Sequence, residues 1–183
     1  MKKLNICMYG GASKNVAQNY YDAVTELGRE IADRGHKLIY GGGASGMMGA
    51  VAKAVVDNGG LVTGVVPNFL RTLEPVYENC TILIKTETMS DRKQIMEENA
   101  DAFVIAPGGI GTFDEFFQIL TLKDLGRTDK PIVLFNVDGY YDSMTNVIVE
   151  CTEKGFIRPH VVELYDVCPT AVSVLDTIER HHN

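Results

Sequence analysis

The stretch from Pro107 to Glu115 has the residue types and spacing of a phosphate-binding turn. It reads PGGIGTFDE, so three glycines leave the main chain bare and its N–H groups can close around a small anion. An apolar run at residues 102–106 precedes it, and apolar residues at helical spacing follow it. The pattern therefore predicts a strand, a glycine-rich turn and a helix whose positive N-terminal end points at the anion.

Glu115 lies one turn inside this expected helix. A carboxylate repels phosphate, so we expect Glu115 to serve the sugar next to the phosphate. A structural interpretation is also open, because Thr112 and Glu115 are spaced as a capping box with Thr112 as N-cap. Glycines after a strand are common in ordinary turns as well. The spacing by itself leaves both interpretations open.

Two adjacent cations, Arg92 and Lys93, are the second feature that could do chemistry. They fall in the first turn of a helix expected from about Ser90, its N-cap, to Asn99. Cations there oppose the helix dipole by roughly 0.3–1 kcal/mol each, and a local rule broken without visible gain indicates function. The alternative is a solvated surface pair, supported by Glu97 four residues after Lys93.

Strands alternate with helices along the chain. Expected strands cover residues 4–9, 37–40, 61–66, 80–84, 102–106, 131–137 and 161–167. Expected helices cover residues 16–34, 47–57, 90–99, 140–154 and 170–180, with one more from the glycine-rich turn to about 126 and a short helix or loop at 68–78. Most strands are continuously apolar, which is typical of a parallel sheet covered on both faces. We therefore expect one α/β domain over residues 1–183, a three-layer, doubly wound, Rossmann-like fold with helices on both faces.

Ligands of such a sheet bind beyond the carboxyl ends of the strands. Glycine-rich turns at residues 10–13, 41–46 and 108–111 would all open on that edge. The second turn fits G-x-G-x-x-G, but it does not follow the first strand. The next strand ends at Pro67 and Asn68, with no carboxylate to hold a ribose, so NAD and FAD are not expected.

The composition narrows the classes of partner. The chain has 183 residues, of which 45% are hydrophobic and 22% charged, and its net charge is -7. An acidic chain does not suit nucleic acid or an anionic membrane surface, and no segment approaches the ~20 apolar residues of a membrane span. The four cysteines lack Cys-x-x-Cys spacing, so we expect free thiols in a reducing cytoplasm and no metal site.

The motifs together resemble the LOG ("Lonely Guy") family of cytokinin riboside 5′-monophosphate phosphoribohydrolases, which are often mislabelled lysine decarboxylases. The resemblance rests first on DRK at residues 91–93 and PGGIGTFDE at residues 107–115. The segment GGGASGMMG at residues 41–49 is similar to a second family signature. DKP at residues 129–131 and NVDGYY at residues 136–141 resemble a third.

The resemblance implies hydrolysis of the N-glycosidic bond of AMP or of N6-substituted (cytokinin) adenosine monophosphates, without cofactor or metal. It implies that Arg92 and Glu115 are catalytic. The residues that it places on the substrate are Glu74, Lys93, Gly108, Gly109, Ile110, Gly111, Thr112, Phe113, Asp114 and Thr121. It also implies a homodimer with each site near the subunit boundary. Residues 10–13 and Ile110 differ from the commoner family pattern, which leaves the preferred base open.

The implied chemistry agrees with the residue types. Breaking the C1′–N9 bond gives an oxocarbenium-like sugar, which the carboxylate of Glu115 could stabilise while orienting the attacking water. Arg92 could stabilise the departing base or hold the phosphate, and both roles stay open. The alternative function is a non-catalytic nucleotide or phosphate carrier on the same scaffold. Such a carrier would share the glycine-rich turns without needing Glu115 or Arg92.

Overall fold

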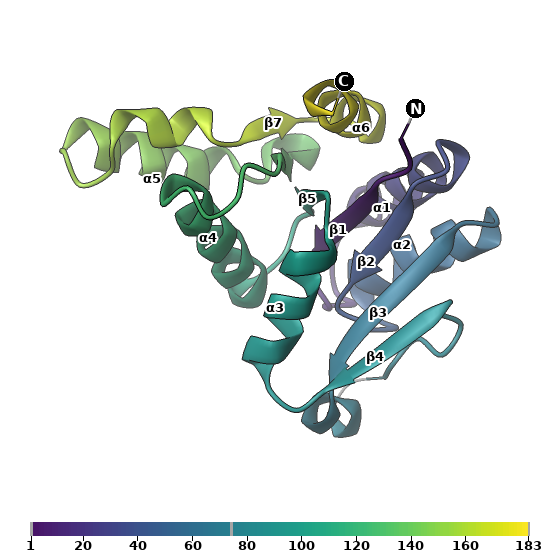
Figure 1. Ribbon diagram of the computed structural model, residues 1–183. Helices are drawn as coiled ribbons and strands as arrows, with labels where there is room; N and C mark the ends of the chain where they lie inside the picture. Colours follow the sequence, from purple (N-terminus) through teal and green to yellow (C-terminus); the bar gives the residue numbers. More distant parts are fainter. Residues whose placement is uncertain (1, 74, 183) are drawn as a thin grey trace.

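A computed structural model describes residues 2–73 and 75–182 of the chain. In this part of the chain one parallel sheet has the strand order β4-β3-β2-β1-β5-β6-β7 (Figure 1). The strands are β1 (Asn5–Tyr9), β2 (Lys37–Tyr40), β3 (Leu61–Pro67), β4 (Ile82–Thr86), β5 (Ala102–Ile105), β6 (Ile132–Phe135) and β7 (Asp166–Cys168). Every neighbouring pair is parallel, as expected from the alternation of strands and helices.

Helices connect the strands and cover both faces of the sheet. The α-helices are α1 (Gln18–Asp33), α2 (Gly46–Asp57), α3 (Met89–Asn99), α4 (Ile110–Asp124), α5 (Asp142–Glu153) and α6 (Ala171–His181). Short 3-10 turns are η1 (Asn68–Thr72), η2 (Val137–Gly139) and η3 (Pro159–Glu163). Within the described ranges, the helices are all too short or too polar to cross a membrane.

Two hydrophobic cores, one on each face, hold the three layers together. On β1, Ile6 and Met8 face the core shared with α1, α2 and α6. The alternate residues Cys7 and Tyr9 face the core shared with α3, α4 and α5. All four side chains are buried, because a strand in the middle of a covered sheet has no solvent face. This arrangement confirms the expected three-layer, doubly wound fold.

The strand order reverses at β1. From β1 the chain builds outward through β2, β3 and β4, and it then returns to place β5 against the other side of β1. At such a reversal the connections leave in opposite directions, so a crevice opens beyond the carboxyl ends of the two strands. The turns that follow β1 and β5 are therefore brought together.

The expected start of the third helix is wrong. Thr88, not Ser90, is its N-cap, and the helix begins at Met89. Thr88 Oγ1 accepts from the N–H of Asp91 at 3.0 Å, and the Asp91 carboxylate accepts from the N–H of Thr88 at 3.2 Å. This reciprocal capping box decides where the helix starts. Arg92 consequently lies at the fourth helical position, two residues deeper than expected.

Two expected strands are also displaced. The expected strand 80–84 is β4, which begins two residues later because its pairing with β3 sets Ile82 opposite Thr63. The expected strand 161–167 overlaps the 3-10 turn η3 at residues 161–163, and only its last two residues belong to β7, which pairs with β6. Both boundaries depend on partners distant in sequence, which local patterns do not contain.

Candidate active site

A cleft of about 370 Å³ lies at the crevice beyond β1 and β5. Its walls come from the turns after β1, β2 and β5, from η1, and from the first turns of α3 and α4. Both residues expected to be catalytic, Arg92 and Glu115, line it. Of the residues expected to bind substrate, those that line the cleft are Gly109, Gly111, Thr112 and Asp114.

Helix α4 begins without a side-chain cap. Its N-cap is Gly109, and Thr112 is its third residue rather than its N-cap. The capping-box interpretation of Thr112 and Glu115 is therefore wrong, because the helix starts before the position that it requires. Gly108 allows this early start, since a Cβ at that position would come 2.1 Å from Thr112 Oγ1. The first N–H groups of α4 remain available to a ligand in the cleft.

Two glycines of this turn face open space. Gly109 and Gly111 are exposed, and a Cβ built on either would meet no described atom within 4 Å. Packing within the described chain therefore does not require glycine at these positions. Bare main chain at a helix N-terminus, at the edge of a cleft, is an arrangement that binds anions.

Arg92 and Glu115 form a buried ion pair in the cleft. Nη1 of Arg92 lies 3.4 Å from Oε1 of Glu115, and each residue is 7% exposed. Nε of Arg92 is buried and has no hydrogen-bond partner among the described residues. Leaving a buried charged donor unpaired is costly, so an acceptor atom of a ligand would complete the site.

Gly41, at the end of β2, makes room for the guanidinium of Arg92. A Cβ on Gly41 would come 2.0 Å from Nη2 of Arg92, so the charged group lies directly against bare main chain. Sequence reasoning placed Gly41 in a glycine-rich turn and a family signature, but it did not connect Gly41 with Arg92. The available signal was a strand-end glycine on the same sheet edge as an unexplained cation.

The other glycines of the turn after β2 are packed tightly. Gly42 has φ +75, and a Cβ there would come 2.0 Å from Cγ2 of Val66. Gly46 has φ +61, and a Cβ there would come 2.5 Å from the carbonyl carbon of Ala12. Positive φ favours glycine over any other residue. This turn is therefore built around protein atoms and not around a ligand.

Burial sets the protonation of the Glu115 carboxyl. Desolvation raises the pKa of Glu115 to about 7, although the nearby charges of Arg92 and Lys93 act to lower it. The carboxylates of Asp114 and Glu97 act in the raising direction. Glu115 therefore exchanges its proton near neutral pH, which suits a group that accepts a proton during catalysis.

Lys93 is engaged by other side chains. Its ammonium group binds the carboxylate of Asp114 and donates to Oε1 of Gln118 at 3.0 Å. The Gln118 amide also donates to the carboxylate of Glu97. These four side chains tie α3 to α4, the two helices that carry Arg92 and Glu115. Sequence reasoning missed Gln118, whose spacing of four residues from Asp114 was the available signal.

Three further expected binding residues belong to the same turn but have other surroundings. Gly108 is buried beneath the turn, and the side chain of Ile110 is 82% exposed. Phe113 is half-buried and packs edge-on against Tyr141, with the ring centroids 6.4 Å apart. The side chains of Ile110 and Phe113 therefore frame the turn, while its main chain faces the cleft.

Thr121, another expected binding residue, is not brought to the cleft. Thr121 follows Glu115 by six residues, about 9 Å along the helix axis, and its hydroxyl donates to the carbonyl of Phe117 at 2.7 Å. It lines a separate cavity of about 200 Å³ together with Phe117 and Phe156. Glu74 lies outside the described residues. In residues 2–73 and 75–182, no group of three His, Cys, Asp or Glu side chains could hold a metal ion.

Sequence comparisons place the chain among known proteins. The family model described as "Possible lysine decarboxylase" matches residues 48–178. The chain is 39% identical over 176 residues, 96% of its length and 82% of the relative, to cytokinin riboside 5′-monophosphate phosphoribohydrolase LOG3 of Arabidopsis thaliana. It is also 39% identical over 175 residues, 96% and 83% of the two chains, to a probable enzyme of the same name, LOGL3, from Oryza sativa subsp. japonica.

A solved structure shares the fold at lower identity. The molybdenum cofactor carrier protein of Chlamydomonas reinhardtii superposes with a TM-score of 0.75 over 98% of both chains, at 23% sequence identity. At this identity the likeness concerns the fold alone.

Proposed function

Since this chain belongs to the LOG family, we propose that its cleft hydrolyses the N-glycosidic bond of AMP or of N6-substituted adenosine 5′-monophosphates. The products are the free base and ribose 5-phosphate. The observation that carries the proposal is the buried pair of Arg92 and Glu115 beside a bare main-chain turn. The pair and the turn lie in one cleft, so a nucleotide can reach both.

The turn after β5 would bind the 5′-phosphate. The uncapped N–H groups at the start of α4 and the open glycines 109 and 111 supply donors and space. The phosphate is remote from the bond that breaks. Its binding energy therefore serves to position the sugar over the catalytic pair.

Glu115 and Arg92 would act on the glycosidic bond itself. As the C1′–N9 bond breaks, its electron pair leaves with the base and positive charge develops on the sugar. The Glu115 carboxylate stabilises that charge and accepts a proton from the water whose oxygen bonds to C1′, and the departing base takes up one proton, which leaves neutral base and ribose 5-phosphate. Arg92 stabilises the negative charge of the departing base through its free Nε donor.

A carrier that only binds nucleotides would need the turn but not the pair. Keeping two charges buried in a cleft is unfavourable for folding, and binding phosphate does not require the carboxylate. The placement of Glu115 inside the cleft therefore favours the enzyme over the carrier.

The direct test is product release. The protein is incubated with AMP and with isopentenyladenosine 5′-monophosphate, and the free base and ribose 5-phosphate are quantified by chromatography. We expect release from at least one of them and far less from adenosine, which lacks the phosphate. Protein that binds AMP tightly and releases nothing would identify a carrier instead.

We also propose that a second copy of the chain covers the surface around Thr121. Apolar side chains are exposed there, among them Phe117 at 41%, Leu125 at 61% and Phe156 at 85%. A homodimer would bury them and bring the threonine to a subunit boundary. Light scattering should give twice the chain mass, and Phe156→Asp should shift it toward the monomer.

The four cysteines are unpaired thiols, which supports a reducing cytoplasmic location.

A further inference from the structure

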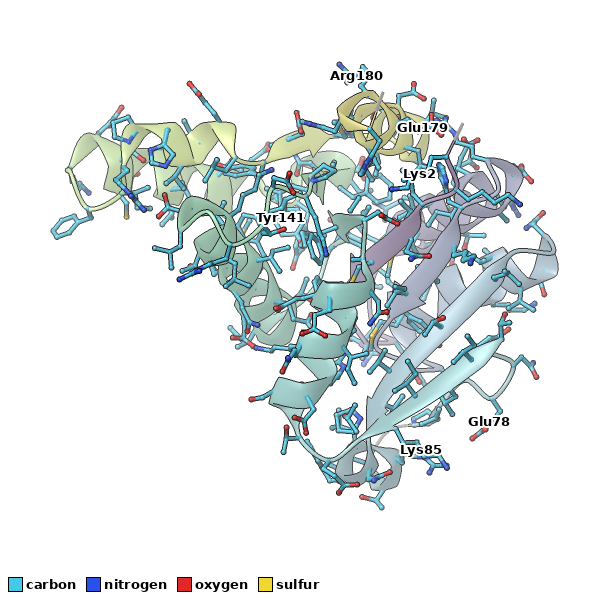
Figure 2. The ribbon with its side chains drawn as sticks, viewed as in Figure 1. Lys2, Glu78, Lys85, Tyr141, Glu179 and Arg180 are labelled. Atoms are coloured by element: carbon cyan, nitrogen blue, oxygen red, sulfur yellow. The ribbon has the colours of Figure 1, made fainter. Side chains whose placement is uncertain are left out.

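The segment NVDGYY, residues 136–141, reaches the phosphate-binding turn from β6. The Tyr140 hydroxyl donates to the carbonyl oxygen of Gly108 at 2.6 Å. The Tyr141 hydroxyl, labelled in Figure 2, donates to the carbonyl oxygen of Ala106 at 2.6 Å. Neither tyrosine lines the cleft. Their hydroxyl groups therefore act on the main chain of the turn from behind.

The carbonyl between these two is held as well. The N–H of Gly11, from the turn after β1, donates to the carbonyl oxygen of Pro107 at 3.1 Å. Three consecutive carbonyl oxygens, of residues 106, 107 and 108, thus each accept from a donor outside α4. Carbonyl oxygens repel an anion. Because all three accept hydrogen bonds from protein donors, they oppose phosphate binding less.

Peptide geometry links the Gly108 carbonyl to the cleft. In a trans peptide unit the C=O and the following N–H point in opposite directions. Holding the Gly108 oxygen on the Tyr140 hydroxyl therefore turns the N–H of Gly109 away from Tyr140. Gly109 lines the cleft, and its N–H has no acceptor within the described part of the chain.

Hydrogen bonds and ring contacts position the segment that carries Tyr140. The Asn136 side chain accepts from the N–H of Tyr141 at 2.7 Å and donates to Asp142 at 2.8 Å. The ring of Tyr140 stands edge-on to the rings of Tyr20 and Tyr141, at centroid distances of 5.8 Å and 5.0 Å. Ring packing alone would not require a hydroxyl at position 140.

We propose that Tyr140 is a positioning residue for the 5′-phosphate: its hydroxyl fixes the Gly108–Gly109 peptide so that the Gly109 N–H faces the anion. The inference rests on the proposed function, because it uses the same cleft and the same phosphate. It does not require turnover, since it concerns binding of the phosphate group. Tyr140 acts through the main chain and does not touch the substrate.

The experiment compares Tyr140→Phe with the wild type and with Tyr20→Phe, which removes a hydroxyl from the same aromatic cluster. Affinities are measured for inorganic phosphate, ribose 5-phosphate and adenosine. Loss of one hydrogen bond at the turn should weaken both phosphate ligands about 3- to 10-fold and leave adenosine unchanged. Tyr20→Phe should bind all three as the wild type does. With AMP as substrate, KM should rise while kcat stays near the wild-type value.

Two results would overturn the inference. One is an unchanged phosphate affinity in Tyr140→Phe, and the other is an equal loss for adenosine, which a general structural defect would cause. If the variant does not fold, amide NMR of the wild type decides: inorganic phosphate must shift the Gly109 resonance, and a shift confined to other residues counts against the proposal. Wild type that binds phosphate but does not hydrolyse AMP would refute the proposed function alone.

Discussion

The turns after β2 and β5 are both rich in glycine, but the surroundings of Gly41 and Gly42 differ from those of Gly109 and Gly111. In the turn after β2, added Cβ atoms on Gly41 and Gly42 would come 2.0 Å from protein atoms. In the turn after β5, added Cβ atoms on Gly109 and Gly111 would meet no described atom within 4 Å. In the turn after β2, glycine lets other parts of the protein pack against the main chain. In the turn after β5, Gly109 and Gly111 leave space that a ligand can occupy. Glycine content alone does not separate a packing turn from a binding turn.

The largest expected effect tests whether the reaction depends on Glu115, which lies in α4 after β5. Glu115→Gln removes the charge that we propose stabilises the sugar cation, so kcat for AMP should fall by at least about 10³-fold. The fold and the affinity for phosphate should persist, as measured by circular dichroism and competition binding. Glu98→Gln, on the exposed surface of α3, is the matched control and should keep full activity. Comparable turnover in both variants would remove Glu115 from the mechanism.

Gly41→Ala tests the packing turn. The new methyl group would displace the end of the Arg92 side chain, which is flexible, so the protein should fold with little loss of stability. Displacing a catalytic group by an ångström or more costs about 10²-fold in rate. Steady-state kinetics and thermal melting measure both effects. An active Gly41→Ala variant would show that the position of the guanidinium does not matter.

The pH dependence of activity is expected to follow Glu115, which lies in α4 just after the turn. Since the pKa of Glu115 is about 7, kcat/KM should rise about tenfold per pH unit below that value and level off above it. Stability should change in the opposite direction. The folded state holds the Glu115 proton between pH 4.5 and about 7, so the free energy of unfolding falls as pH rises, by on the order of 3 kcal/mol. Urea unfolding at several pH values should show a steeper slope in the wild type than in Glu115→Gln, where the raised pKa of Glu97 still contributes.

The contacts between α3 and α4 predict a smaller effect. Gln118→Glu places a second carboxylate against Glu97 and should push the two helices apart, lowering kcat about 5-fold through the geometry of the catalytic pair. The double variant Glu97→Gln, Gln118→Glu exchanges the two groups and restores a donor opposite an acceptor. Its kcat should return toward the wild-type value. If the double variant does not regain activity, the contact between residues 97 and 118 does not control the geometry of the catalytic pair.

Gly111→Ala has the smallest expected effect. Its sign, a gain in stability, distinguishes the turn after β5 from the tightly packed turn after β2. Gly111→Ala places a methyl group in open space near a helix start, so it should stabilise the protein by about 0.5–1 kcal/mol. The same methyl group enters the cleft and should raise KM for AMP about 3-fold. Thermal melting and kinetics measure the two changes. A destabilised Gly111→Ala variant would mean that the turn after β5 is packed like the one after β2.

The features of the fold that depend on residues close together in the sequence could mostly be predicted from it. The apolar strands predicted the layers of the fold. The glycine-rich turn and the cation pair before the fifth strand predicted the sheet edge at which Arg92 and Glu115 lie. The N-cap at Thr88 was missed although its partner Asp91 lies only three residues away. Ser90 has an equally good capping side chain, and only geometry distinguishes the two.

Other features depend on residues far apart in the sequence. The clash that requires glycine at position 41 involves Arg92, and the hydroxyl of Tyr140 reaches back to Gly108. The raised pKa of Glu115 follows from burial, which the sequence does not specify for a single carboxylate. Spacing and the family resemblance placed Arg92 and Glu115 at one sheet edge, while their contacts required the folded chain.

The central place of β1 has a consequence for synthesis on the ribosome. Of the strands in this sheet, β1 emerges first and can pair on one side once β2 follows, but its other edge has no partner until β5 has been translated. Through most of that interval the nascent chain has an open edge and a half-covered sheet, which are the features that chaperones protect. The two walls of the cleft meet only when β5 docks, so a chain truncated before that strand cannot have acquired any activity.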